Sequence, residues 1–210
     1  MAPENIKWKY WLILTVDANF QMKNKERNTW DTPALGDGWV HFVPETPYME
    51  YVWKWGFEEQ CDQCDSELRA IDVVNSKFLK GYKATGIGGV FCTRHGLVRK
   101  NGLGNLQKGE RYANMVFLAF YSLMFSVLTT IVFSYDIACQ WHQNLNARML
   151  RLPPEMWIAS DLFQALLFFI PKLHIYAHGA KCQYKFSFNF QRWSVCTDGE
   201  DPKRFWSHTY

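Results

Sequence analysis

Three acidic residues stand at positions from which their carboxylates could meet at one site. Asp17 ends a predicted strand, Asp136 ends another strand after a long uncharged run, and Glu200 begins a predicted helix. Hard cations such as Mg²⁺ prefer oxygen ligands, and two of them roughly 4 Å apart can stabilise the attacking and leaving oxygens of a phosphodiester. The three acids are therefore candidates for a two-metal site. Each acid alone is also typical of a helix cap or a solvated strand end, and the pattern does not decide between these interpretations.

Cysteine and histidine residues form a second set of candidates. Pairs with metal-ligand spacing occur at 61–64 (CxxC) and 92–95 (CxxH), and HxxxHxxxC spans 174–182. Zinc takes four such ligands in a tetrahedron, so these segments predict a zinc site. The alternative is a set of free buried cysteines and a hydrogen-bonded core histidine. Cys139 and His142 are also three residues apart, but core packing is the better interpretation of that pair.

The composition predicts one folded domain, or one domain with a large insertion. Of the 210 residues, 48% are hydrophobic and 17% are aromatic, which is enough for a substantial core. The net charge of +3 is too small to indicate a nucleic-acid partner by itself. The amino-terminal segment lacks the features of a signal peptide. The six cysteines have no disulfide-framework spacing, which favours a reducing intracellular compartment.

The uncharged run ahead of Asp136 has two interpretations. Residues 113–135 are long enough to span a bilayer, as in a small membrane protein. However, the first half of the run suits a buried helix, whereas TTIVFSYDI is β-branched and aromatic. We therefore expect a core helix over 113–126 and a central strand over 129–137, with no membrane partner.

Helices and strands are also predicted along the rest of the chain. The other strands are expected at 12–16, from residue 20, at 90–92 and within 165–178. The other helices are expected over 64–79, over 138–152 and after a cap at Thr197 or Asp198. We expect a tight Asp-Ala-Asn connection after the first strand and an irregular insertion over 27–60. GIGG (86–89) is expected to be a turn, and GLGNLQKGERYANM is expected to open the long helix. This order of elements predicts a mixed α/β sheet.

Several segments in order resemble the Kyakuja–Dileera–Zisupton (KDZ) transposases. They are TGIGGVFCTRHGLVRKNGLGNLQKGERYANM, SYDIACQWHQNLNARM, PKLHIYAHGAKCQYKFSFNF and TDGE. VDANFQMKNK is similar to the first catalytic stretch of the family, and CDSELRAIDVVNSKF is similar to its segment ahead of the cysteine–histidine turn. The resemblance runs from Thr15 to Trp206, which is nearly the whole chain.

The resemblance implies a single domain over 1–210 with an α/β, RNase H-like mixed sheet flanked by helices. An irregular insertion at about 27–85 would lie between the second and third strands. The implied function is that of a DDE-type DNA transposase catalytic domain, with two-metal phosphodiester cleavage and strand transfer. The matching acids are Asp17, Asp136 and Glu200, and the implied cofactor is Mg²⁺ or Mn²⁺. The implied partner is DNA, both element ends and target, and a homo-oligomer and a nuclear or cytoplasmic location are further expectations.

The family pattern also narrows the candidate zinc ligands. It matches Cys64, Cys92, His95, His178 and Cys182, whereas Cys61 looks like an addition.

The chain departs from the family around its last motif. Lys203 stands where a second glutamate is typical, Cys196 replaces a basic residue, and Val116 stands where an aspartate is usual. The last helix is expected to be cut short at the carboxyl end. These departures keep a second function open, namely an inactive or domesticated transposase relic that acts as a zinc-containing binding module.

Overall fold

The computed structural model describes residues 3–26, 39–57, 81–124, 126, 130–194 and 196–209. Its strands are β1 (Leu12–Asn19), β2 (Asn24–Lys25), β3 (Tyr82–Ala84), β4 (Gly86–Cys92), β5 (Leu97–Leu106), β6 (Ile131–Tyr135) and β7 (Leu167–Phe169). Its helices are α1 (Glu45–Trp55), α3 (Tyr112–Leu123), α4 (Ala138–Trp141), α5 (Leu145–Met149), α6 (Ser160–Gln164), α7 (Ala180–Phe186) and α8 (Asp201–Trp206). The helix predicted over 64–79 lies outside the described residues.

Five strands form one mixed sheet in the order β5-β4-β1-β6-β7. β1 is antiparallel to β4 and parallel to β6, β4 is antiparallel to β5, and β6 is parallel to β7. β2 and β3 form a separate two-stranded sheet. The predicted mixed α/β sheet is therefore confirmed, and the carboxyl ends of the central strands β1 and β6 lie side by side, with Val16 opposite Tyr135.

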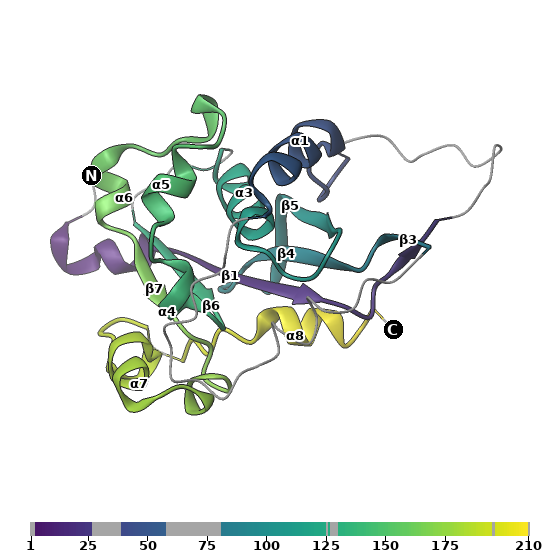
Figure 1. The fold of residues 1–210 in the computed structure, drawn as a ribbon. Coiled ribbons are helices and arrows are strands. Elements are labelled where there is room, and N and C mark those ends of the chain that lie inside the picture. Colours follow the sequence, from purple (N-terminus) through teal and green to yellow (C-terminus); the bar gives the residue numbers. More distant parts are fainter. Residues whose placement is uncertain are drawn as a thin grey trace.

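Helices cover both faces of the sheet (Figure 1). α3 packs on β4 and β5 and contacts α1 and α5, whereas α8 packs on β1 and β4 from the other side. Two glycines of β4 allow this close approach. A Cβ at Gly88 would lie 3.0 Å from Leu118 of α3, and a Cβ at Gly89 would lie 3.1 Å from Trp206 of α8. Successive strand residues face opposite sides, so GIGG is part of a covered strand and its prediction as a turn was wrong.

The uncharged run is divided between a helix and a strand. Every residue of α3 except Tyr121 is buried, and so are all five residues of β6. A helix that is buried all round needs no polar face, and a strand covered on both sides is apolar without alternation. The predicted core helix and central strand are confirmed, with bounds a few residues shorter. Within the described ranges, no helix is both long and apolar enough to cross a bilayer.

Several predicted boundaries were wrong. β1 continues through Asp17 to Asn19, where the sequence predicts a tight connection, and the strand predicted from Phe20 is reduced to the two residues of β2. GLGNL belongs to β5, so the long helix begins only at Tyr112. β1 and β5 each pair with β4, and this pairing explains why both strands are longer than predicted. The hydrogen bonds between the strands continue past residues that favour turns locally.

The other differences concern helices. The insertion predicted to be irregular contains the helix α1, which packs against α3. The helix predicted over 138–152 is two short helices, because Asn144 adopts a left-handed conformation (φ 55°) between them. The predicted strand within 165–178 is limited to the three residues of β7.

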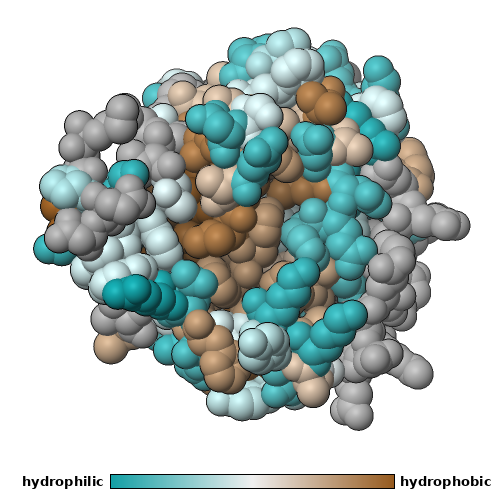
Figure 2. Space-filling model, turned by 90° about the vertical axis from the view of Figure 1, so that its left-hand side faces the viewer, coloured by the Kyte–Doolittle hydropathy of each residue, from teal (hydrophilic) through white to brown (hydrophobic). Residues whose placement is uncertain are grey.

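The end of the molecule at the left of Figure 1 carries α6 and α7. Figure 2 shows this end face-on, and hydrophobic side chains gather there in a hollow that hydrophilic side chains surround. The hydrophobic residues of this protein are therefore not confined to its interior.

Candidate active site

Asp17 and Asp136 come together because β1 and β6 are parallel neighbours. Val16 pairs with Tyr135, so Asp17 and Asp136 follow in the same register and face the same side of the sheet. That side is the one covered by α8, whose Trp206 Nε1 donates a 3.1 Å hydrogen bond to Oδ2 of Asp17. Both carboxylates line one small pocket at the carboxyl ends of these strands.

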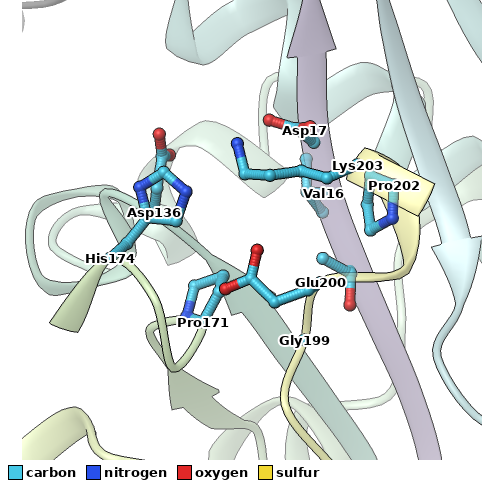
Figure 3. A pocket seen from close by; sticks show the side chains of 10 residues that line it. Val16, Asp17, Asp136, Pro171, His174, Gly199, Glu200, Pro202 and Lys203 are labelled. Carbon is cyan, nitrogen blue, oxygen red and sulfur yellow. The ribbon is translucent and has the colours of Figure 1, made fainter. Parts of the chain in front are cut away.

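Glu200 reaches the same pocket from the start of α8 (Figure 3). It occupies the N-cap position of this helix, so the prediction of a cap at Thr197 or Asp198 was wrong. Gly199 brings it there: its φ is +75°, and a Cβ on it would lie 2.4 Å from Ser134 Oγ of β6. Only a glycine allows the turn to lie so close to the strand. The backbone N–H of Leu173 then donates to Glu200 Oε1 at 3.0 Å, which orients the carboxylate.

Two carboxylate oxygens in this pocket are left unsatisfied. Oδ1 of Asp136 and Oε2 of Glu200 are buried and have no hydrogen-bond partner among the described residues. A buried carboxylate oxygen without a partner costs free energy unless a cation or a donor offsets it. The pocket itself has a volume of about 10 Å³, which is close to the minimum that holds one water molecule. Both observations fit a small, hard cation with oxygen ligands.

Burial and neighbouring acidic charges raise the pKa values of the two aspartates. Burial and the nearby charge of Asp136 together raise the pKa of Asp17 to about 6. Burial also raises the pKa of Asp136 to about 6, while the backbone N–H groups of Asp136 and Ile137 oppose this shift. Both carboxylates are therefore mostly ionised above pH 7 and become protonated near pH 5.

Lys203 of α8 extends across the pocket, and its ammonium points toward the space between Asp17 and Asp136 (Figure 3). Its positive charge lowers the pKa of both aspartates, against the effect of burial. The same charge, together with burial, lowers the pKa of His174, which also lines the pocket. Lys203 therefore supplies part of the positive charge that this acidic pocket requires.

A fourth acid, Glu110, interacts electrostatically with the acids of the pocket and was not predicted. The Tyr135 hydroxyl donates a 2.5 Å hydrogen bond to Glu110 Oε1. Burial raises the pKa of Glu110 well above its ordinary value, and the charge of Asp136 adds to this shift. Glu110 lies ahead of α3 rather than at a strand end, so strand-end reasoning had no signal for it. GERYANM was part of the segment that resembles the KDZ family, but Glu110 was not singled out there.

The predicted zinc ligands fall into separate places. Cys64 lies outside the described residues. Cys92 and His95 form a pair, with 3.1 Å between Sγ and Nδ1, near the amino-terminal half of β1, where Cys92 is opposite Leu14. His178 and Cys182 lie instead beside Cys139 of α4, and the ligand atoms of these three residues are all within 4.8 Å of one another. The interpretation of Cys139 as a core-packing residue did not predict its proximity to His178 and Cys182, because these two residues are remote from Cys139 in sequence.

Comparison with known proteins identifies one family for this chain. The profile of the KDZ (Kyakuja-Dileera-Zisupton) transposases matches residues 10–210. Neither a curated protein nor a solved structure matches the chain. The matched segment includes β1, β6 and α8, and therefore all three predicted acids. Because the match covers almost every residue, the protein belongs to the Kyakuja–Dileera–Zisupton transposase family.

Proposed function

We propose that this chain is a DDE-type DNA transposase catalytic domain built on an RNase H-like sheet. The observation that carries the proposal is the convergence of Asp17, Asp136 and Glu200 in one pocket from three separate segments. Membership of a transposase family supports DNA as the substrate and partner. The mixed sheet, with acids after two neighbouring parallel strands, supports the RNase H-like assignment.

Two of the three acids are oriented by hydrogen bonds within the chain. Trp206 holds one oxygen of Asp17, and the backbone of Leu173 holds one oxygen of Glu200. Oδ1 of Asp136 and Oε2 of Glu200 accept no hydrogen bond from the described residues. Such preorganisation lowers the reorganisation cost at the moment of reaction.

Asp17, Asp136 and Glu200 would hold Mg²⁺ or Mn²⁺, which when bound supplies charge stabilisation at a phosphodiester and an activated water. Lys203 keeps Asp17 and Asp136 ionised at neutral pH by lowering their pKa values. Its ammonium, which points toward the space between Asp17 and Asp136, would also contact a phosphate oxygen of DNA bound there. Catalysis would thus rest on positioning and charge, without a protein nucleophile.

A plasmid-nicking assay tests this proposal. The purified chain is incubated with supercoiled DNA and Mg²⁺ or Mn²⁺, and nicked product is measured for the wild type and for Asp136→Asn. We expect cation-dependent nicking by the wild type and its loss in the variant. Asp161→Asn is the matched control, because Asp161 is an exposed aspartate of α6 away from the pocket lining.

The result also separates the active enzyme from the alternative of a relic. If the wild type binds Mn²⁺ but nicks no DNA, catalysis by this chain is refuted and the binding-module alternative takes its place. If Asp136→Asn nicks as fast as the wild type, the acidic pocket is not the active site. A homo-oligomer stays a prediction, and the mass of the DNA complex measures it.

A further inference from the structure

A group of sulfur and nitrogen atoms lies close to the acidic pocket but is distinct from it in chemistry. Cys139 comes from α4, His178 immediately precedes the N-cap of α7, and Cys182 lies in α7. The ligand atoms of all three lie within 4.8 Å of one another, and Cys139 Sγ is 3.6 Å from His178 Nδ1. Among the described residues, this is the one group of three or more Cys, His, Asp or Glu side chains whose ligand atoms all lie this close together, whereas the three acids share a pocket with wider separations.

The sheet explains why these remote residues meet. β6 and β7 are parallel neighbours, so the segments that follow them, α4 and the turn before α7, leave the sheet at the same edge. α4 and α7 then contact each other. Cys139 and His178 are buried, whereas Cys182 is only partly buried. The group therefore sits at the edge of the core, with one side accessible to solvent.

We propose that Cys139, His178 and Cys182 bind a structural zinc ion. Two thiolates and an imidazole are ligands that zinc prefers over the hard cations of the acidic pocket. Ligand atoms around a tetrahedral zinc lie roughly 3.3–3.8 Å apart, as the Zn–N and Zn–S bond lengths require. The Cys139–His178 separation already matches this spacing, and the longest separation in the group needs to close by only about 1 Å. The partly exposed side of Cys182 leaves room for a water molecule as the fourth ligand.

A second observation places His178 against the turn that carries Asp136. Burial lowers the pKa of the His178 imidazole, and the nearby backbone of Asp136 opposes this shift. The same ring has its Nδ1 3.6 Å from Cys139 Sγ. Cys139 is three residues beyond Asp136 on the same turn. A zinc ion here would therefore tie the turn that carries Asp136 to α7. The zinc site does not depend on the proposed transposase activity, since binding requires no DNA.

Metal analysis of the purified 210-residue chain tests the proposal. After dialysis against metal-free buffer, we expect one zinc per chain in the wild type, and a loss of at least about 90% in Cys139→Ser and in Cys182→Ser. Cys92→Ser, Cys64→Ser and Cys196→Ser are matched controls that should retain zinc. A wild type without zinc would overturn the proposal, and so would loss of zinc in Cys92→Ser or Cys64→Ser but not in Cys182→Ser.

A measurement on the unchanged chain covers the case in which the variants fail to fold. Thiols are alkylated before and after a zinc chelator is added, and each cysteine is read by mass spectrometry. We expect Cys182 to become at least about tenfold more reactive with chelator, while the exposed Cys196 reacts equally in both cases. Equal reactivity of Cys182 in both samples, or a Cys139–Cys182 disulfide, would refute zinc binding. Asp136→Asn should keep its zinc, so the failure of nicking and the failure of zinc binding are read separately.

Discussion

The acidic pocket and the Cys139–His178–Cys182 group share one turn of the chain but offer opposite ligands. Asp136 lines a pocket whose polar side chains carry only oxygen and nitrogen groups, including those of Glu200 and Lys203. Three residues later, Cys139 joins a thiol and an imidazole on the other side of that turn. Hard cations favour the first set and zinc favours the second. The comparison teaches that two groups with different types of ligand atom can lie within a few residues of each other at the carboxyl ends of β6 and β7.

The two sites also differ in how they are held. The acids are oriented by single hydrogen bonds from Trp206 and from the backbone of Leu173, both of which depend on where α8 and the preceding turn lie. The sulfur and nitrogen ligands lie on two short helices, α4 and α7. We therefore expect changes in the acidic pocket to leave the second site intact, whereas loss of the second site should disturb the first.

The largest expected effect follows from Asp136→Asn. Removing the charge that faces the buried pocket should weaken Mn²⁺ binding and nicking by more than about 100-fold, because the amide is a poor ligand there. Zinc content should not change. Mn²⁺ titration by electron paramagnetic resonance measures the first quantity, and Asp161→Asn is the control. Equal Mn²⁺ affinity in the variant and the wild type would remove Asp136 from the site.

Cys182→Ser tests whether the second site supports the first. Loss of zinc should loosen the turn that carries Asp136 and weaken Mn²⁺ binding roughly tenfold, as loss of an outer ligand contact commonly does. Cys196→Ser, in an exposed cysteine, should have no effect. The same Mn²⁺ titration is the measurement. An unchanged affinity in a variant that has lost zinc would mean that the two sites are independent.

Lys203→Gln should have a smaller effect of opposite sign. The ammonium repels a divalent cation in the pocket, so its removal should tighten Mn²⁺ binding by roughly three- to tenfold. It should also raise the pKa of Asp17 and Asp136, because Lys203 lowers both. Mn²⁺ titrations at pH 6 and pH 8 separate these effects, since the gain should be larger at pH 8. Weaker binding at pH 8 would show that Lys203 positions the acids rather than competing with the metal.

The smallest expected effect concerns stability without divalent metal. The pKa of Asp136 in the folded chain is about 6, above the ordinary value of 3.8, so the folded state binds more protons than the unfolded state between these pH values. This carboxylate therefore destabilises the fold increasingly as the pH rises through about 4 to 6. We expect Asp136→Asn to be more stable than the wild type by about 1 kcal/mol at pH 7.5 and equal to it near pH 4. Urea unfolding at the two pH values measures the difference in the free energy of unfolding between the variant and the wild type. Both proteins contain the same buried histidines, so the contribution of the histidines cancels in this difference. A variant less stable than the wild type at pH 7.5 contradicts the pKa shift.

Local pattern was enough for the elements that carry the acids. The β-branched texture of TTIVFSYDI predicts a strand, the all-apolar stretch before it predicts a buried helix, and Asp136 stands at the end of that strand by its position in the sequence. The order of VDANF, SYDIAC and TDGE supports the family resemblance, which the profile match confirms. These inferences succeed because helix and strand periodicity is a property of neighbouring residues.

Only the tertiary structure decided which side chains meet. Glu110 joins Asp136 through Tyr135, and Cys139 meets His178 and Cys182 because β6 and β7 are parallel neighbours, a pairing that no local pattern encodes. GIGG is a strand because helices cover both of its faces, although four such residues favour a turn locally. The sequence by itself therefore predicted the core helix and the central strand, proposed the three acids and indicated the family. The pairing of strands, which depends on contacts between residues far apart in the chain, decided the contents of both sites.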